Sequence, residues 1–531
     1  MVYVSFNFLV FLLAVLILYY ALPKRAQWAV LLVANYIFYL LNGIEQAAFI
    51  VFTTLLTFFA ALWMQRLWNR YNDSIEGQNL DKSELRARKK QVSKKVHRIQ
   101  AATVLIGLGI LAVCKYLGFI AANLNSLFAV FSWNARLPMI NIIVPLGISF
   151  YTFQSLGYIL DIGKNKYPAE RHLGRYAAFV SFFPTIVQGP ICSFQEVGKQ
   201  FSTPHRLDYN NLKFGAQLMM WGFFTKMVIA DRVSSIVTTI FSKEGYTQYS
   251  GSILFFGMLA YAVQIYCDFS GGINISIGAA KMLGIELPKN FERPYFSTSV
   301  SDYWRRWHIT LGNWMREYVF YPVMLSKFVS KLSNSARKHI SSYAGRMVPS
   351  VITPFVVFLL IGIWHGASWQ FLSFGLYNAI VVAGGVALTP VFQWMTRALR
   401  IDTSVFSWKL FCIIRTFLLT GISKILVVSP GLSAALYILR RIFTDPNPEP
   451  LVRKICDLGL DGRNMFVLFI AVLILLTVSI LQESGIKMRE TIAKQNLVFR
   501  WILVLGLLAV ILVFGCYGPS YSAAAFIYEA Y

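Results

Sequence analysis

Uncharged segments long enough to cross a lipid bilayer recur along the whole chain. A spanning α-helix needs roughly 20 apolar residues, because the bilayer core offers no water to backbone polar groups. Of the 531 residues 56% are hydrophobic and 14% are charged, whereas soluble domains carry roughly 25% charged residues. The pattern predicts an all-α polytopic membrane protein with about 11–12 transmembrane helices plus re-entrant or in-plane helices. The predicted spans are roughly 4–22, 27–43, 47–65, 101–121, 139–160, 213–231, 250–267, 350–364, 368–389, 408–428, 464–482 and 499–517.

Basic residues gather between these spans. The net charge is +25, from 49 Lys and Arg against 24 Asp and Glu. The most basic segment is the loop 66–100, and it follows an odd-numbered span. The positive-inside rule then makes this loop cytoplasmic and both termini extracytoplasmic, in the cell membrane. Basic charge in such positions indicates anionic membrane lipids, not nucleic acid, as the partner. Five other basic segments also follow odd-numbered spans, so the same rule makes them cytoplasmic. They are 24–25, 164–175, 281–346, 397–409 and 483–500.

Two regions fit poorly as simple spans. Residues 176–195 are uncharged, but Pro184 and the pair Gly189-Pro190 interrupt them, which favours a re-entrant or in-plane element. Residues 269–349 are too polar to span and too apolar for a solvated domain, so we expect helices lying at the cytoplasmic interface.

Polar residues inside predicted spans indicate a cavity. The segment 145–154, PLGISFYTFQ, mixes Pro, Gly and polar residues and ends at Gln154. Span 408–428 contains Arg415 and Lys424, which either snorkel or pair between helices, or line a polar cavity. None of the six cysteines forms a CxxC or Cys/His cluster, so neither a metal nor a disulfide framework is predicted.

A histidine follows directly after a predicted span. His365 ends the uncharged run 347–364 and precedes a second uncharged run, 366–396. A neutral imidazole avoids most of the roughly 2.5–3.5 kcal/mol that a formal charge costs at a membrane helix centre. A buried neutral imidazole is also what a general base requires. The alternative is a packing histidine bonded to a backbone carbonyl.

The segment 266–321 is dense in polar and aromatic residues. Asp268 lies at the inner end of a span, beside a flexible break at Ser270–Gly272. Farther on, Ser299–Asp302 forms a capping-box pattern, which predicts that a helix begins near Ser299.

This predicted helix carries an aromatic face with His308 beside it. The face consists of Trp304, Trp307, Leu311 and Trp314, while Arg305 and Arg306 point elsewhere. One interpretation is that the arginines meet the phosphates of a cytoplasmic donor and His308 points into the protein. The other is an aromatic interfacial anchor with flanking arginines.

Several motifs in this order resemble the membrane-bound O-acyltransferase (MBOAT) family. They are PLGISFYTFQ, FFPTIVQGPI, DFSG, LPKNFERPY, YWRRWHITL, REYVFYP and GIWHGASW, from about residue 145 to 380. The branch that they resemble contains the alginate O-acetylase and the teichoic-acid D-alanyl transfer protein.

The resemblance implies one membrane domain over residues 1–531, built as a helical ring around a tunnel between a cytoplasmic donor and an outer acceptor. It makes His365 the catalytic histidine and places His308 in the tunnel. We expect the tunnel and donor site to include Trp304, Arg305, Trp307, Asp268, Trp364 and Gln154.

The tail 518–531 resembles a C-terminal FIYF-type motif of such acyltransferases or of a small partner. In that motif the tyrosine accepts the acyl group, which corresponds to Tyr528. Glu529 departs from the motif, since an aromatic residue is expected there. The alternative is a terminal aromatic anchor at the outer interface. The carrier interpretation implies an extracellular SGNH or esterase-like transferase as partner.

The resulting prediction is an O-acetyltransferase for a cell-surface polysaccharide that uses an acyl thioester such as acetyl-CoA and binds no cofactor. D-alanyl transfer to teichoic acid is the alternative within the enzyme class. A proton-coupled transporter, for which internal repeats are expected, and a non-catalytic scaffold are the alternatives outside it.

Overall fold

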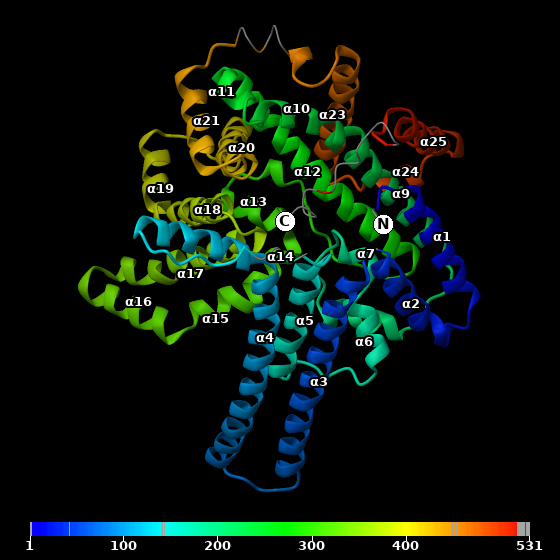
Figure 1. The fold of residues 1–531 in the computed structure, drawn as a ribbon, viewed down its shortest axis with the longest axis vertical. Coiled ribbons are helices and arrows are strands. Elements are labelled where there is room, and N and C mark those ends of the chain that lie inside the picture. Colours follow the sequence, from blue (N-terminus) through cyan, green and yellow to red (C-terminus); the bar gives the residue numbers. More distant parts are fainter. Residues whose placement is uncertain are drawn as a thin grey trace. The chain divides into compact units, whose positions relative to one another are not determined.

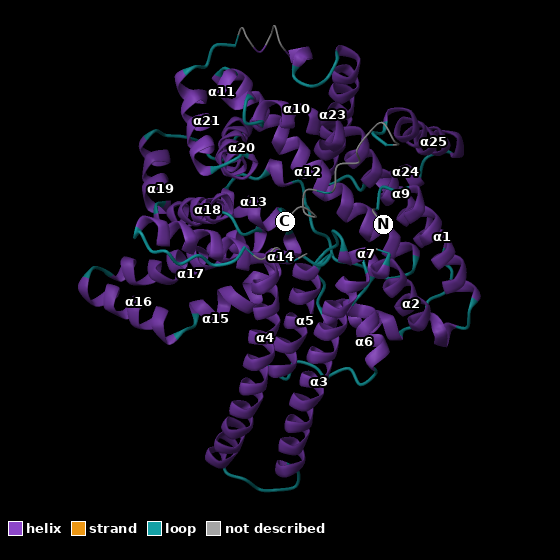
Figure 2. Cartoon of the chain, viewed as in Figure 1, coloured by secondary structure: helices purple, strands orange, loops and turns teal. Residues whose placement is uncertain are grey.

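The described part of the chain is entirely helical. The computed structural model describes residues 3–41, 43–139, 142, 144–448, 451, 455–517 and 526, without the side chain of Glu45. Over these residues there is no β-strand (Figure 2), and only Phe291 and Trp307 form an isolated antiparallel bridge. The chain divides into two compact units, one within 1–216 and 276–288 and the other within 217–275 and 289–531.

Two long helices dominate the first unit. The helices α3 (Ile44–Ile75) and α4 (Lys82–Val130) lie side by side, with α5 (Ile148–Gly163) against both (Figure 1). The basic segment 66–100 is largely helical, because only residues 76–81 separate the two helices, and its cytoplasmic location stays a prediction. Straight-chain Lys, Arg, Glu and Gln favour helix. The Asp81 side chain caps α4 by accepting hydrogen bonds from the backbone N–H groups of Lys82 and Ser83.

The predicted broken segment 176–195 is confirmed. It consists of α6 (Leu173–Val180), α7 (Phe183–Ile186) and α8 (Phe194–Val197), and Pro184 lies in the first turn of α7. Gly189 passes so close to the preceding turn that an added Cβ would lie 2.2 Å from the Cα of Thr185. The placement of these helices in a membrane stays a prediction. The remaining helices of this unit are α1 (Phe6–Ala21), α2 (Gln27–Leu40), the start of α9 and the end of α12.

The second unit contains the later helices. They are α9 (Tyr209–Phe223) from Gln217 on, the π-helix η3 (Phe224–Ala230), α10 (Asp231–Phe241), α11 (Gly245–Gln248), α12 (Gly251–Met282) to Ile275, α13 (Val300–Arg306), α14 (Ile309–Met315), the π-helix η5 (Arg316–Phe320), α15 (Tyr321–Met324), α16 (Lys327–His339), α17 (Ser342–His365), α18 (Trp369–Ala387), α19 (Thr389–Ala398), α20 (Phe406–Val428), α21 (Leu432–Thr444), α23 (Gly462–Glu483), α24 (Met488–Ala493) and α25 (Leu497–Phe514).

The predicted break at Ser270–Gly272 is wrong, because α12 continues through it. Gly271 allows close packing of two helices and does not make the chain flexible. A Cβ added at Gly222 would lie 2.6 Å from the carbonyl oxygen of Gly271, and a Cβ at Gly271 would lie 3.0 Å from that of Gly222. The two helix backbones therefore approach each other at these glycines, as small residues permit in membrane helix pairs.

The predicted polytopic class is confirmed. Among the described residues, eight helices are long and apolar enough to cross a membrane by length and composition: α3, α4, α12, α17, α18, α20, α23 and α25. The other predicted spans correspond to the shorter helices α1, α2 and α5 and to α9, which η3 continues with π geometry. At about 1.5 Å per residue, the 14 to 16 residues of α1, α2 and α5 fall short of a bilayer core of roughly 30 Å. The predicted ring and tunnel stay predictions.

Candidate active site

His308 lies at a break between two helices. Ser299 caps α13 as predicted, by accepting a hydrogen bond from the backbone N–H of Asp302. The predicted continuation of this helix to Trp314 is wrong, since α13 ends at Arg306 and His308 adopts a left-handed φ of 47°. Such a conformation costs a non-glycine residue on the order of 1–3 kcal/mol and is found at functional sites.

An earlier loop compensates for this break. The backbone N–H of Glu292 donates to the carbonyl of Arg306 at 2.9 Å, and that of Ile309 donates to the carbonyl of Asn290 at 3.0 Å. These bonds flank Trp307 and His308. The directions of both side chains are therefore set by residues 290–292 and not by a helical face.

The hydrogen bonds of His308 define its tautomer. Its Nδ1 lies 3.2 Å from the Oδ1 of Asn290, which also accepts the backbone N–H of Thr310 at 3.0 Å. Because an N–H needs an acceptor, this assignment makes the Asn290 atom an oxygen and makes Nδ1 of His308 the donor. Burial lowers the pKa of His308 well below its usual range, and the imidazole of His365 lowers it further. His308 is thus neutral, with its lone pair on Nε2.

A cavity of about 330 Å³ adjoins His308. This volume lies at the lower end of the roughly 300–1,000 Å³ typical of small-molecule sites. Arg305 and Arg316 are exposed at this cavity. It is mainly apolar, and its other lining residues are Ser301, Trp304, Trp307, Leu311, Gly312, Met315, Phe320, Tyr321, Pro354, Val357, Phe358, Ile361 and Val382.

His365 is the last residue of α17, as expected from its position after an uncharged run. Ser368 then caps α18 by accepting a hydrogen bond from the backbone N–H of Phe371. A Cβ added at Gly362 would lie 2.5 Å from the carbonyl oxygen of Phe371. The two helices therefore pack closely beside His365, whose side chain is buried against the rings of Phe371 and Phe374.

A second, smaller cavity of about 40 Å³ adjoins His365. Trp304 and Trp307 line both cavities, so these two indoles separate His365 from the space beside His308. The Nε1 of Trp304 donates to the Oδ1 of Asn378 at 3.2 Å, which holds that indole in place. The other residues lining the small cavity are Tyr261, Ile265, Tyr303, Phe371, Phe374, Ser423, Lys424 and Val427.

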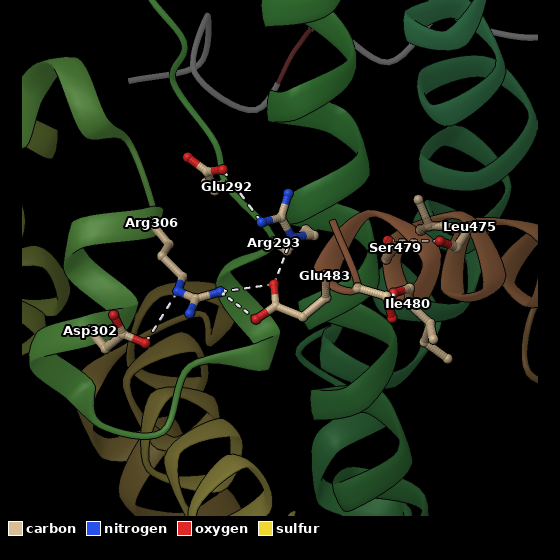
Figure 3. Close-up of polar contacts among 9 residues, drawn as sticks. Glu292, Arg293, Asp302, Arg306, Leu475, Ser479, Ile480 and Glu483 are labelled. Carbon is tan, nitrogen blue, oxygen red and sulfur yellow. Dashed lines mark hydrogen bonds and ion pairs between the residues drawn. The ribbon is translucent and has the colours of Figure 1, made fainter. Parts of the chain in front are cut away.

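The adjacent arginines Arg305 and Arg306 have different roles (Figure 3). Arg306 pairs with Asp302 at 3.1 Å and with Glu483 at 3.1 Å, and Glu483 also binds Arg293 at 2.7 Å. The arginine pair was expected to meet donor phosphates, but Arg306 is held in this network. Arg305, with 65% of its side chain exposed and a longer contact of 3.6 Å to Asp302, is free to turn toward a ligand.

The other predicted site residues lie in several places. The ring of Trp364 lies 5.8 Å from that of His308 and 5.0 Å from that of His365. Asp268 does not line either cavity and instead binds the buried Lys226 at 2.6 Å. Gln154 is buried on α5 in the first unit. Tyr528 lies outside the described residues.

The residue Phe526, two positions before Tyr528 in the sequence, is described and buried. Its ring lies 4.6 Å from the Nζ of Lys226. The segment after α25 reaches the same region, because the backbone N–H of Cys516 donates to the carbonyl of Met227 at 3.0 Å. Cys516 and Phe526 therefore both contact residues of η3.

The sequence did not identify the roles of Asn290, which holds His308, or of Arg316 and Lys424, which line the cavities. Asn290 and Arg316 lie within the motifs LPKNFERPY and REYVFYP, but neither residue was singled out from them. Lys424 has a signal of another kind: Cys412, Thr416, Thr420 and Lys424 form a buried stripe at four-residue spacing on α20. Such a polar stripe on a membrane helix indicates the side that faces protein or a cavity.

Comparison with known proteins gives the same identification as the motifs. The profile of the membrane-bound O-acyltransferase family matches residues 170–337. A protein named probable alginate O-acetylase AlgI, from Pseudomonas syringae pv. tomato, is 30% identical over 439 residues, which are 82% of this chain and 74% of that protein.

Two further relatives have other substrates in their names. The peptidoglycan O-acetyltransferase of Helicobacter pylori is 31% identical, with 55% of this chain and 58% of that protein covered. The teichoic acid D-alanyltransferase of Bacillus subtilis is 30% identical, with 46% of this chain and 60% of that protein covered. With the long match to the alginate relative, these similarities show that the chain belongs to the membrane-bound O-acyltransferase family and is an O-acyltransferase.

Proposed function

We propose that this protein is a membrane O-acetyltransferase that moves acetyl groups from a cytoplasmic thioester, such as acetyl-CoA, toward a cell-surface polysaccharide. The observation that carries the proposal is the pair of histidines beside two cavities that share Trp304 and Trp307. The names of the alginate and peptidoglycan relatives support acetyl as the acyl group and a polysaccharide as the final acceptor.

In this proposal the larger cavity binds the donor and the smaller cavity, beside His365, is where the acyl group is transferred. The thioester donor enters the larger cavity, where Arg305 and Arg316 bind its phosphates. Its acyl carbon reaches His365 past the two indoles. His365 removes the proton of the attacking hydroxyl, which contributes on the order of 10²–10⁴ in rate. His308, neutral and with its lone pair on Nε2, orients the donor and the attacking group. Trp364, whose ring lies near both histidine rings, is assigned to the wall of this site and not to the chemical step, whereas the tunnel positions expected for Asp268 and Gln154 stay predictions.

The test is transfer of radioactive acetyl from acetyl-CoA by membranes containing the wild type or His365→Ala. We expect transfer to fall at least about 10²-fold, because the site loses its base. His339→Ala, at the exposed end of α16, is the matched control and should keep wild-type activity. Transfer by His365→Ala near the wild-type rate would refute the assignment.

D-alanyl transfer is the second candidate, because one relative is named a teichoic acid D-alanyltransferase. The two functions differ in the donor. Membranes offered acetyl-CoA and, separately, a D-alanyl carrier protein should transfer only acetyl if the first proposal is correct. Transfer of D-alanine alone would establish the second.

Transfer across the membrane needs a carrier, and we assign this role to Tyr528. A hydroxyl on the chain's tail would take the acyl group beside His365 and pass it to an extracellular esterase-like transferase of the SGNH type. Tyr528→Phe keeps the aromatic ring and removes the hydroxyl, so it should stop polymer acetylation, whereas Tyr531→Phe should not. Normal polymer acetylation by Tyr528→Phe, or the absence of an acetyl adduct on the tail by mass spectrometry, would exclude the carrier.

The proposed location is the cell membrane, with both termini outside and the basic half of α4 in the cytoplasm. This orientation rests on the positions of the basic segments. An introduced Ser93→Cys should resist an impermeant thiol reagent in intact cells and react after permeabilisation. Reaction in intact cells would reverse the topology.

A further inference from the structure

Lys424 is a buried lysine that lines the cavity of His365. It lies on α20 and is only 5% exposed, and together with His365 it lines the smaller cavity. An ionisable residue within a membrane helix costs free energy to bury, and it is therefore a candidate functional residue. The groups that contact Lys424 indicate whether its role is structural or functional.

Among the described residues, the groups around Lys424 are a backbone carbonyl and aromatic rings. Its Nζ donates one hydrogen bond, to the carbonyl of Thr420 at 3.3 Å. It lies 5.1 Å from the ring centroids of both Tyr295 and Tyr303. Within the part of the chain that the structure describes, no carboxylate pairs with it.

Aromatic rings stabilise a cation through their negative faces, most strongly when the pair is desolvated. This compensates only part of the free-energy cost of burying an ion. An ammonium group has three N–H donors, and one of them is used for Thr420. The remaining donors are suited to an oxygen atom that becomes negative, and the adjoining cavity of about 40 Å³ has room for a group of that size.

We propose that Lys424 is a catalytic residue that stabilises the negative charge that develops on the carbonyl oxygen of the acyl group during transfer. This inference rests on the proposed function, because it takes the thioester as donor and His365 as base. It adds the electrostatic partner that an acyl transfer requires, since the oxyanion of the tetrahedral intermediate needs preorganised donors.

The step balances as follows. His365 removes the proton of the acceptor hydroxyl, and the hydroxyl oxygen forms a bond to the acyl carbon. The π electrons of the carbonyl move onto its oxygen, which becomes an oxyanion facing the ammonium group of Lys424. When the carbonyl re-forms, the carbon–sulfur bond breaks. The thiolate leaves with the proton from His365, and Lys424 neither gains nor loses a proton.

The test compares Lys424→Met, which removes the charge and keeps a long side chain, with Lys409→Met. Lys409 lies on the same helix but is exposed. Removal of one oxyanion-stabilising donor lowers kcat by about 10²–10³-fold. We expect that loss in Lys424→Met with the KM for acetyl-CoA within about threefold of wild type, because the interaction forms only in the transition state. Lys409→Met should match the wild type.

Rescue separates the charge from a packing role. Lys424→Ala leaves a space in which ethylammonium can replace the missing end of the side chain, so added ethylammonium should raise its kcat at least tenfold, whereas propanol should not. A merely structural role would give no selective rescue. Wild-type kcat in Lys424→Met, or equal effects of ethylammonium and propanol on Lys424→Ala, would overturn the proposal.

A binding measurement keeps this result separate from the proposed function. Acetate resembles the oxyanion, and we expect it to bind the purified wild type and Lys409→Met, but at least tenfold more weakly to Lys424→Met. If the wild type transfers nothing from acetyl-CoA, the proposed function fails, and the acetate titration still decides the role of Lys424. Equal acetate affinity in all three proteins would exclude the anion site.

Discussion

Lys226 and Lys424 are both buried lysines of the second unit, but their surroundings are opposite. The Nζ of Lys226 lies 2.6 Å from Asp268 and 2.8 Å from Asp231. Lys424 has two tyrosine rings and a backbone carbonyl in place of carboxylates. The charge of Lys226 is paired with two carboxylates, whereas Lys424 lines the cavity beside His365 and has no carboxylate partner among the described residues.

The difference teaches how to distinguish a structural charge from a functional one. Lys226 is surrounded by groups that fix its geometry, including the ring of Phe526, and it lines neither cavity. Its removal would leave buried carboxylates without their partner. Lys424 can be replaced with less damage to the fold, because no buried carboxylate among the described residues depends on it.

Lys226→Met should destabilise the protein strongly. Breaking a buried ion pair by removing one partner costs about 3–5 kcal/mol, because the remaining charge stays buried and uncompensated. The free energy of unfolding in detergent would measure this loss, with Lys24→Met at the exposed residue Lys24 as the control. Equal stability of the two variants would remove the structural assignment. Adding Asp268→Asn to Lys226→Met should restore part of the loss.

The close helix contact beside Lys226 predicts a smaller loss. A methyl group at Gly222 would lie 2.6 Å from the carbonyl oxygen of Gly271, so Gly222→Ala should push α9 and α12 apart. Overpacking of this kind costs about 1–3 kcal/mol. Gly385→Ala is the control, because nothing lies within 4 Å of its added Cβ, and it should be neutral or slightly stabilising. The idea fails if Gly222→Ala is as stable as Gly385→Ala.

Much of the fold follows from local sequence patterns. Long apolar runs predicted the helices α3, α12, α17, α18, α20, α23 and α25, and the capping pattern found the start of α13 at Ser299. His365 was correctly expected at the end of a helix. These features depend on residues within one or two helical turns, which is why sequence alone reveals them.

The missed features depend on contacts between distant residues. The helix break at His308 is created by Asn290, whose side chain accepts hydrogen bonds from His308 and Thr310 at sequence separations of 18 and 20. The predicted flexibility at Ser270–Gly272 was wrong because Gly222, far away in sequence, packs there. The place of Lys424 in the His365 cavity likewise requires that four segments, 261–265, 303–307, 365–374 and 423–427, meet. A pattern of neighbouring residues cannot predict these contacts between distant segments.

His308 differs from both lysines because it is a buried group in its neutral form. Its lowered pKa means that the folded state takes up a proton only well below pH 6.5, while the unfolded state does so near that value. The unfolded state therefore binds more protons below about pH 6.5, and stability falls there by at most about 1.4 kcal/mol per pH unit. His308→Gln should remove this part of the slope between about pH 6.5 and 5, whereas His339→Gln at an exposed site should retain it. Identical slopes in His308→Gln and the wild type would contradict the neutral assignment.

The smallest effect is expected at Glu483, which pairs with Arg293 and Arg306 (Figure 3) but leaves 22% of its side chain exposed. Water already screens this pair, so Glu483→Gln should cost only about 0.5–1 kcal/mol in the free energy of unfolding.

Salt should affect the stability losses of Glu483→Gln and Lys226→Met differently. At about 1 M salt the Debye length falls to roughly 3 Å, so the loss in Glu483→Gln should nearly vanish, while the loss in Lys226→Met should persist because buried pairs are screened much less. The measurement is the unfolding free energy of both variants at low and high salt. If both penalties disappear together, Lys226 is not shielded from solvent as its burial implies, and the contrast between the structural and the functional lysine loses its physical basis.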